Sequence, residues 1–181
     1  MDFILAGFVE AIRLLFGGDG QTWSAVAATL KASTGSMATS LVLGIPLGFV
    51  LGYFDFPAKR QARLLVDTAL ALPTVFIGLV VYAFISNRGP LGEMGLLFTL
   101  PGIAIGQTIL ALPIVIALSA TAVESMDRHL RTLLISLGAG RRQLLLSSLW
   151  EVRYGLLAAG LAAYGRVMTE VGISMMVGGN I

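Results

Sequence analysis

Apolar residues fill long intervals between the charged residues of this chain. Four such stretches carry few or no charges and are long enough to cross the ~30 Å hydrocarbon core of a bilayer as helices, at residues 33–54, 68–87, 102–123 and 154–172. The pattern predicts an all-α fold: a polytopic transmembrane helical bundle of about four spans, with residues 1–181 forming a single domain.

Two other segments have a different pattern. Residues 3–16 are apolar almost continuously but too short to cross a bilayer, and they carry Glu10 and Arg13 three positions apart. We therefore expect a helix that lies in the membrane interface. Residues 124–153 connect the third and fourth spans and are rich in arginine, so we expect a loop outside the membrane.

Glycines recur at every fourth position in the first span, at Gly44, Gly48 and Gly52. Small residues at this spacing share one helix face and let a neighbouring helix approach closely. We interpret the stripe as a packing face.

Four residues within the spans are candidates for a pathway or gate. Pro73 and Pro113 each follow Ala-Leu; they are expected either simply to kink their helices or to expose carbonyl groups to a pathway. Arg166 and Glu170 lie four positions apart on one helix face, and ionisable residues inside a span are functional candidates by default. A structural tie near a helix end is the alternative for this pair, and the sequence favours neither.

The composition agrees with a membrane protein and argues against several other functions. Of the 181 residues, 56% are hydrophobic and 12% are charged, and the net charge of +2 gives no basic surface for nucleic acid. There is no cysteine and one histidine, His129, so we expect no metal site and no cofactor. An enzyme is disfavoured because His129 lies in the loop, away from any acidic or serine-rich cluster.

Basic residues are distributed unevenly between the two faces of the predicted bundle. One face would carry only Arg13, Lys31 and Arg88, whereas the other would carry Lys59, Arg60, Arg63, Arg128, Arg131, Arg141, Arg142 and Arg153. The positive-inside rule makes the second face cytoplasmic and places the N-terminus outside.

The connection at 124–153 has a helical pattern of its own. Leu130, Leu133, Leu134 and Leu137 follow the spacing i, i+3, i+4 and i+7, and the run stops at the glycine-rich residues 138–140. A second apolar run follows Arg141 and Arg142. A short helix, a glycine turn and a second helix would present a knob to a cytoplasmic partner; an ordinary amphipathic loop is the alternative.

These residues resemble the coupling loop of permease subunits in bacterial ATP-binding-cassette (ABC) importers. That loop begins with Glu-Ala-Ala, has a glycine six residues after the glutamate and ends with Leu-Pro. Gly138 matches the glycine, while residues 132–134 (Thr-Leu-Leu) and 149–150 (Leu-Trp) replace the other consensus letters. The resemblance implies a set of residues that contact an ATPase: Arg131, Thr132, Leu133, Leu134, Ser136, Leu137, Gly138, Ala139, Arg141 and Arg142.

Other segments indicate which permeases of this family the chain resembles most. Residues 71–75, 78–82, 89–92, 95–99 and 106–115 are similar to the tungstate-type permeases, and residues 165–172 resemble a segment shared by molybdate, tungstate and sulfate permeases. The family usually has one further span beyond this point, so the chain is expected to be a shortened member or a piece truncated before a final span.

The resemblance implies a type I ABC importer permease fold (MetI-like) in the bacterial inner membrane, with lipid around it. It implies a homodimeric pathway for an oxyanion, most of all tungstate, with molybdate, sulfate or phosphate as alternatives. An extracytoplasmic binding protein would deliver the oxyanion and a cytoplasmic ABC ATPase would drive transport, in agreement with the lack of a Gly-x-x-x-x-Gly-Lys-Ser/Thr loop in this sequence. A self-standing channel or secondary transporter is the alternative of another class; it would not need the long basic loop.

Overall fold

A computed structural model of the chain describes residues 2–179, except for the side chains of residues 2, 3, 128 and 131. Within this range the chain forms nine α-helices and one short 3₁₀ helix, and no strand. The predicted all-α fold is confirmed.

The first two helices are joined by a short turn. Helix α1 spans Asp2–Phe16, in agreement with the helix expected at 3–16, and α2 spans Gly20–Tyr53, which starts well before the span expected at 33–54. The carboxylate of Asp19 begins α2 by accepting hydrogen bonds from the hydroxyl (2.7 Å) and the amide (2.8 Å) of Thr22, and these bonds lower the pKa of Asp19. Pro46 does not interrupt α2.

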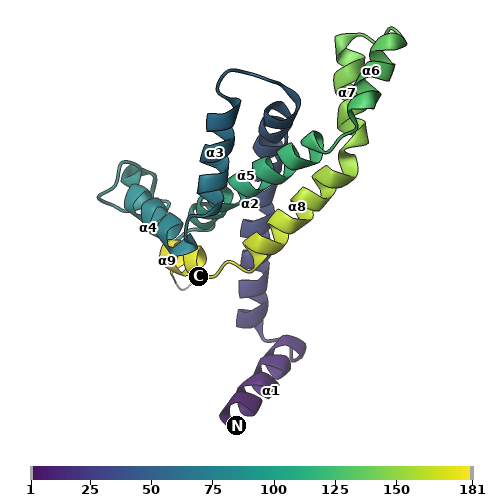
Figure 1. The fold of residues 1–181 in the computed structure, drawn as a ribbon. Coiled ribbons are helices and arrows are strands. Elements are labelled where there is room, and N and C mark those ends of the chain that lie inside the picture. The colour runs from purple at the N-terminus through teal and green to yellow at the C-terminus, as the bar shows by residue number, and fades with distance from the viewer. Residues whose placement is uncertain (1, 180–181) are drawn as a thin grey trace.

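The span expected at 68–87 is not one continuous helix. Helix α3 spans Lys59–Leu70, α4 spans Thr74–Ile85, and the two are bent by 97° (Figure 1). Pro73 lies at the break, because it lacks an amide donor and its ring disfavours helical geometry at Leu72. The 3₁₀ helix η1, at Gly92–Met94, follows α4.

Helices α2 and α5 share the most extensive contact of any two helices in the described part of the chain. Helix α5 spans Leu100–Glu124 and continues through Pro113. A Cβ atom added to Gly44 would lie 2.8 Å from Val115 Cγ1, and one added to Gly48 would lie 2.6 Å from Ser119 Cβ. The glycine stripe is therefore a packing face, as predicted, and its partner is α5.

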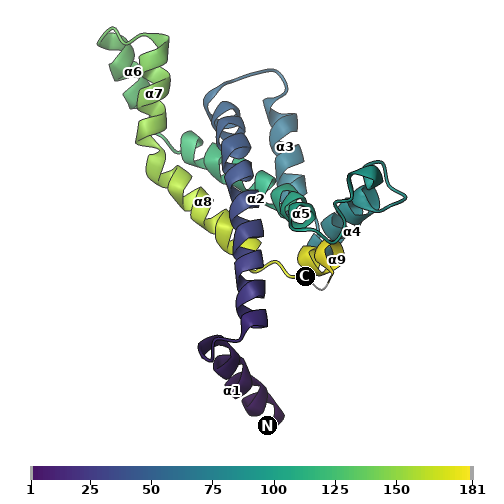
Figure 2. The same cartoon turned by 180° about the vertical axis from the view of Figure 1, so that it is seen from behind.

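The chain then leaves and re-enters the bundle. Helices α6 (Arg128–Ser136) and α7 (Arg141–Glu151) project from one end, which we call the hairpin end, and α8 (Arg153–Met168) returns from it at a bend of 53° (Figures 1 and 2).

Helix α9 (Gly172–Gly178) ends the described part of the chain and packs against α4 and α5. It contributes Ile173 and Val177 to a buried apolar cluster with Ile77, Val81 and Leu110. The stretch expected as a span at 154–172 therefore contains one helix, α8, and the break before α9.

Two of the described helices, α2 and α5, are each long and apolar enough to cross a membrane. The number rises to four if each bent pair, α3 with α4 and α7 with α8, counts as one span. This upper count agrees with the prediction of about four spans from the sequence.

Candidate functional site

The turn between α6 and α7 is fixed by local hydrogen bonds. Gly138 takes a left-handed conformation with φ of 81°. Its amide donates to the carbonyl of Ile135 (2.9 Å), and the amide of Ala139 donates to that of Leu134 (2.9 Å). This pair of bonds is the Schellman motif, which ends a helix on a residue with positive φ. The helix stop predicted from the glycines is confirmed.

The start of each hairpin helix is also set by its own residues. Asp127 caps α6 by accepting from the amide of His129 at 2.8 Å. The Gln143 side chain folds back from α7 and accepts from the amide of Gly140 at 2.8 Å. These local contacts set where each helix of the hairpin begins.

The tip of the hairpin presents apolar and basic side chains together. Leu137 is 83% exposed and Leu133 is 61% exposed. Most of the predicted ATPase-contacting residues with described side chains are also exposed, namely Thr132, Ser136, Gly138, Arg141 and Arg142. The side chain of Arg131 lies outside the described part of the chain. Exposed leucines on a projecting element are typical of a surface that a protein partner covers.

Part of the leucine stripe faces inward instead. Leu134 and Ala139 are half-buried, and Leu130 and Leu134 line an apolar groove of ≈ 1180 Å³ between the hairpin, α2 and α8. The stripe thus divides: Leu130 and Leu134 face the groove, while Leu133 and Leu137 face away from the protein.

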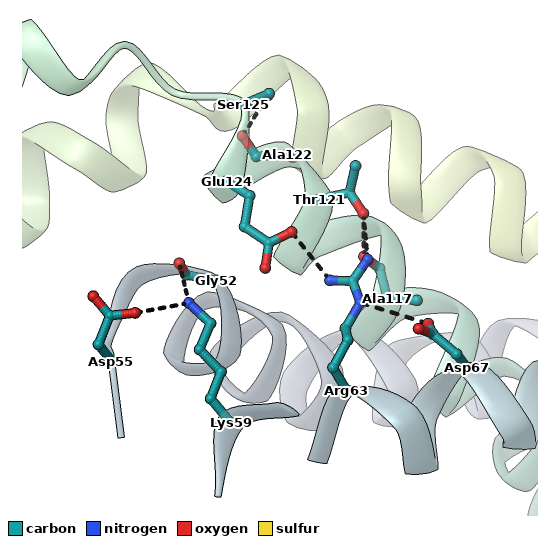
Figure 3. A network of polar contacts seen from close by, with 10 residues as sticks. All are labelled: Gly52, Asp55, Lys59, Arg63, Asp67, Ala117, Thr121, Ala122, Glu124 and Ser125. Atoms are coloured by element: carbon teal, nitrogen blue, oxygen red, sulfur yellow. Dashed lines mark hydrogen bonds and ion pairs between the residues drawn. The ribbon is translucent and has the colours of Figure 1, made fainter. Parts of the chain in front are cut away.

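The base of the hairpin is tied to α3 by a polar network (Figure 3). The guanidinium of Arg63 donates to Thr121 Oγ1 at 2.9 Å and pairs with Glu124 Oε2 at 3.4 Å. Its Nε atom lies 3.5 Å from Asp67 Oδ1. Because Glu124 is the last residue of α5, three positions before Asp127, this contact links α3 to the point where the hairpin begins.

Lys59 lies at the start of α3, at the same end of the fold. Lys59 Nζ donates to the carbonyl of Gly52 at 3.4 Å and pairs with Asp55 at 3.3 Å (Figure 3). The sequence analysis used Lys59 and Arg63 only to orient the chain. The spacing of Arg63 and Asp67 could have indicated their pairing, but nothing in the sequence points to Glu124, which lies 61 positions away.

Arg166 and Glu170 lie together at the break between α8 and α9. Arg166 Nη1 donates to Glu170 Oε2 at 2.8 Å. The other carboxylate oxygen accepts from the amides of Gly172 (3.1 Å) and Ile173 (3.3 Å), which begin α9. The Glu170 side chain is only 4% exposed, against 43% for Arg166. These contacts join the end of α8 to the start of α9 through the Glu170 carboxylate.

The two candidate prolines lie in different surroundings. Pro73 precedes α4 at the α3–α4 break. Its neighbour Thr74 lies near the start of α9, because a Cβ atom added to Gly172 would lie 3.9 Å from Thr74 Oγ1. Pro113 lies within the unbroken α5 and lines an apolar cavity of ≈ 290 Å³ against α3 and α4. The structure brings Pro73 near the Arg166–Glu170 pair and leaves Pro113 apart.

Among the described residues, no group of three or more histidine, cysteine, aspartate or glutamate side chains could hold a metal ion. The polar groups found at the hairpin and at the α8–α9 break form ion pairs and helix caps. Such an arrangement can transmit force and hold helices in register.

Comparison with known proteins finds transport permeases among the relatives of this chain. The tungstate uptake system permease protein of Campylobacter jejuni is 48% identical over 181 residues, which cover 100% of this chain and 76% of that protein. A probable anion ABC transporter permease protein of Haloferax volcanii is 40% identical over 87% of this chain and 68% of its own length. The tungstate uptake system permease protein of Peptoclostridium acidaminophilum is 32% identical over 100% of this chain and 79% of its own length.

Residues 44–174 match the family described as binding-protein-dependent transport system inner membrane component. The matched region runs from the glycine stripe on α2 through the hairpin to α9. It includes both elements described above, the Arg63 network and the Arg166–Glu170 junction. The chain therefore belongs to the family of binding-protein-dependent transport system inner membrane components, the permease subunits of ABC importers.

Proposed function

We propose that this chain is the membrane-spanning permease subunit of an ATP-driven importer for tungstate. The observation that carries the coupled mechanism is the α6–α7 hairpin, which projects from the bundle with Leu133 and Leu137 exposed. The identity of the oxyanion rests on the relatives that are named as tungstate uptake permeases and match the full length of this chain.

The hairpin is the element that receives force from the ATPase. Its tip sits in a groove of a cytoplasmic ABC ATPase subunit, with the leucines in apolar contact and Arg141 and Arg142 facing acidic residues of the partner. Closure of the ATPase pair around nucleotide moves the hairpin as a rigid body. The Arg63 contact to Glu124 passes this displacement to α3 as well as to α5.

This mechanism implies an orientation and further partners. The hairpin end faces the cytoplasm, α1 and the N-terminus lie outside, and an extracytoplasmic oxyanion-binding protein docks on the opposite side. Two copies of the chain form the pathway between them, and lipid covers the remaining apolar surface. The Arg166–Glu170 junction and the nearby Pro73 shape the gate, while Pro113 adjusts the course of α5.

Glycine substitutions at the hairpin turn test the coupling. Gly138→Val forces a β-branched residue into the left-handed region, at about 1–2 kcal/mol, and should abolish tungstate uptake driven by ATP. Gly138→Asn tolerates that conformation and should retain most of the uptake. Gly140→Ala is the matched control, because Gly140 has φ of −73° and a Cβ atom there meets nothing closer than 3.9 Å.

The measurement uses the permease, its ATPase and its binding protein in proteoliposomes. Equal uptake by the Gly138→Val and Gly140→Ala variants would contradict the role of the hairpin. The substrate is tested by tungstate uptake in competition with molybdate, sulfate and phosphate, and stronger uptake of one of these competitors would replace tungstate in the proposal. Tungstate flux through the permease alone, without the ATPase, would instead indicate a self-standing channel or secondary transporter.

A further inference from the structure

The α6–α7 hairpin is attached to the bundle at two places. One is the short connection from α5 to α6, which contains Met126, and the other is Val152, where α7 ends and α8 begins. Helix α6 packs on α7, and α7 packs on α8; in the described part of the chain neither packs extensively on α2, α3 or α5. A displacement of the hairpin therefore reaches the bundle mainly through its two attachments.

Both attachments contribute a side chain to one apolar cluster, which we call the hairpin-base cluster. Its buried residues are Val123 of α5, Val152 and Leu156 of α8. The partly buried side chains packed against them are Ile45, Phe49 and Tyr53, all on α2, and Met126. The end of α2 therefore meets both attachments of the hairpin, although it lies far from them in the sequence.

Two glycines bring other helices close to the last turn of α5. A Cβ atom added to Gly52 of α2 would lie 2.6 Å from the carbonyl oxygen of Ala120 and 2.8 Å from Val123 Cβ. A Cβ atom added to Gly155 of α8 would lie 2.7 Å from Ala122 Cβ. Carbon atoms in contact normally lie about 3.5–4.0 Å apart, so neither glycine has space for a side chain. The last turn of α5 is thus held tightly against both α2 and α8.

Tightly packed contacts of this kind transmit movement. Close-packed interiors have low compressibility, so a displacement of one side of a cluster shifts the other sides instead of being absorbed. On the α2 side the cluster meets stacked aromatic rings, because the centroids of Phe49 and Tyr53 lie 5.1 Å apart and their planes differ by 13°. A movement of the hairpin should therefore carry the adjoining ends of α2 and α8 with it.

We propose that the hairpin-base cluster passes the movement of the hairpin to α2 and α8, with Val152 and Gly155 as positioning residues. This inference rests on the proposed function, because it requires the hairpin to be the element that the ATPase moves. The cluster acts beside the Arg63–Glu124 contact, which leads to α3. The ends of α2, α3, α5 and α8 then move with the hairpin as one rigid body.

The first test changes the contact between α8 and α5 in the complete transporter in proteoliposomes. Gly155→Ala places a methyl group against Ala122 and forces α8 away from α5. The number of ATP molecules hydrolysed per tungstate imported should rise at least about twofold, the lower end of the effects of substitutions along a coupling path. Adding Ala122→Gly removes the opposing methyl group and should restore the ratio. Gly165→Ala is the control in the same helix, because a Cβ atom there meets nothing within 4 Å.

The second test separates transmission from stability. Val152→Ala and Val81→Ala each remove two buried methyl groups, since these side chains are 6% and 3% exposed, but Val81 lies in the separate cluster of α4, α5 and α9. Both variants should lose similar stability and bind the ATPase as the wild type does, because the hairpin tip is unchanged. Only Val152→Ala should raise the ATP hydrolysed per tungstate imported. Equal ratios in the two variants, or no rescue of Gly155→Ala by Ala122→Gly, would overturn the inference.

A third test uses the absence of cysteine from this sequence. Tyr53 and Met126 line one pocket at the hairpin base, so Tyr53→Cys and Met126→Cys in the same chain can be joined by a short thiol crosslinker. Because α2 and the hairpin attachment move together in this proposal, crosslinking should leave the tungstate uptake of the double variant unchanged. Loss of uptake on crosslinking would show that the two move apart and would overturn the inference. Failure of the unmodified transporter to take up tungstate would instead overturn the proposed function, and the inference with it.

Discussion

Replacing Gly48 by alanine tests the contact that holds α2 against α5. The added Cβ atom would lie 2.6 Å from Ser119 Cβ, 2.7 Å from the carbonyl oxygen of Ile116 and 3.2 Å from the amide nitrogen of Ala120. Two of these three atoms belong to the backbone of α5, so no side-chain rotation removes the clash. The two helices must move apart until the contacts approach the usual ~3.5–4.0 Å.

The size of the effect follows from two opposing terms. Overpacking of a tight interface costs about 1–3 kcal/mol. Alanine is a better helix former than glycine by about 0.8–1.0 kcal/mol, which offsets part of this. We expect the Gly48→Ala variant to be less stable by up to about 2 kcal/mol. Gly35 provides the control in the same helix, because a Cβ atom there meets nothing within 4 Å and Gly35→Ala should be neutral or slightly stabilising.

The free energy of unfolding can be measured by titrating a denaturing detergent into the purified protein in mild micelles. The fluorescence of Trp23 and Trp150, the two tryptophans of the chain, reports the transition. Equal stability of the Gly35→Ala and Gly48→Ala variants would refute the inference that the glycine stripe sets the α2–α5 distance. Gly44→Ala and Gly52→Ala should behave like Gly48→Ala, since each added Cβ would lie within 3 Å of α5 atoms.

Two other contacts give predictions that can be measured in the reconstituted transporter or on the purified chain. Arg63→Glu should raise the number of ATP molecules hydrolysed per tungstate imported, because α3 then no longer follows α5. The double variant Arg63→Glu with Glu124→Arg should restore this ratio. Lys59→Ala is the control and should leave the ratio unchanged, since its partner Asp55 is 98% exposed. The direct loss of stability should stay within about 1 kcal/mol, since the Arg63–Glu124 pair is partly exposed. Glu170→Ala removes both amide contacts to α9 and should lower the free energy of unfolding by about 2–4 kcal/mol in the same assay. Glu170→Gln keeps an acceptor for these amides, so its loss of unfolding free energy should be smaller. Equal losses in these two variants would show that the amide contacts contribute little.

Features governed by near neighbours in the sequence could be predicted without the structure. The uncharged stretches give helices because a lipid environment requires each backbone group to be paired within its own segment. The turn at Gly138 was predictable because a positive φ is a property of one residue and its next few hydrogen bonds. The stripe at Gly44, Gly48 and Gly52 could be recognised as a face because a spacing of four fixes one side of a helix.

The sequence identified some candidate residues but did not reveal their geometry. Pro73 signals a break, yet a proline only removes a donor and excludes some conformations, so it does not set the angle of 97° between α3 and α4. The Arg166–Glu170 pair was recognised by its spacing, but its place at the junction before α9 was not, because the spacing of two residues does not reveal where their helix ends.

The sequence by itself determined that this chain is a helical membrane protein with a glycine turn in its basic connection, since hydropathy, charge and glycine conformation act over a few residues. That this connection is a hairpin projecting from the bundle was decided by the tertiary structure. Only the tertiary structure decided which helix the glycine stripe meets and which carboxylates besides Asp67 Arg63 reaches. Those contacts join residues some 60 to 70 positions apart. Their geometry depends on how whole helices pack, which no local pattern encodes.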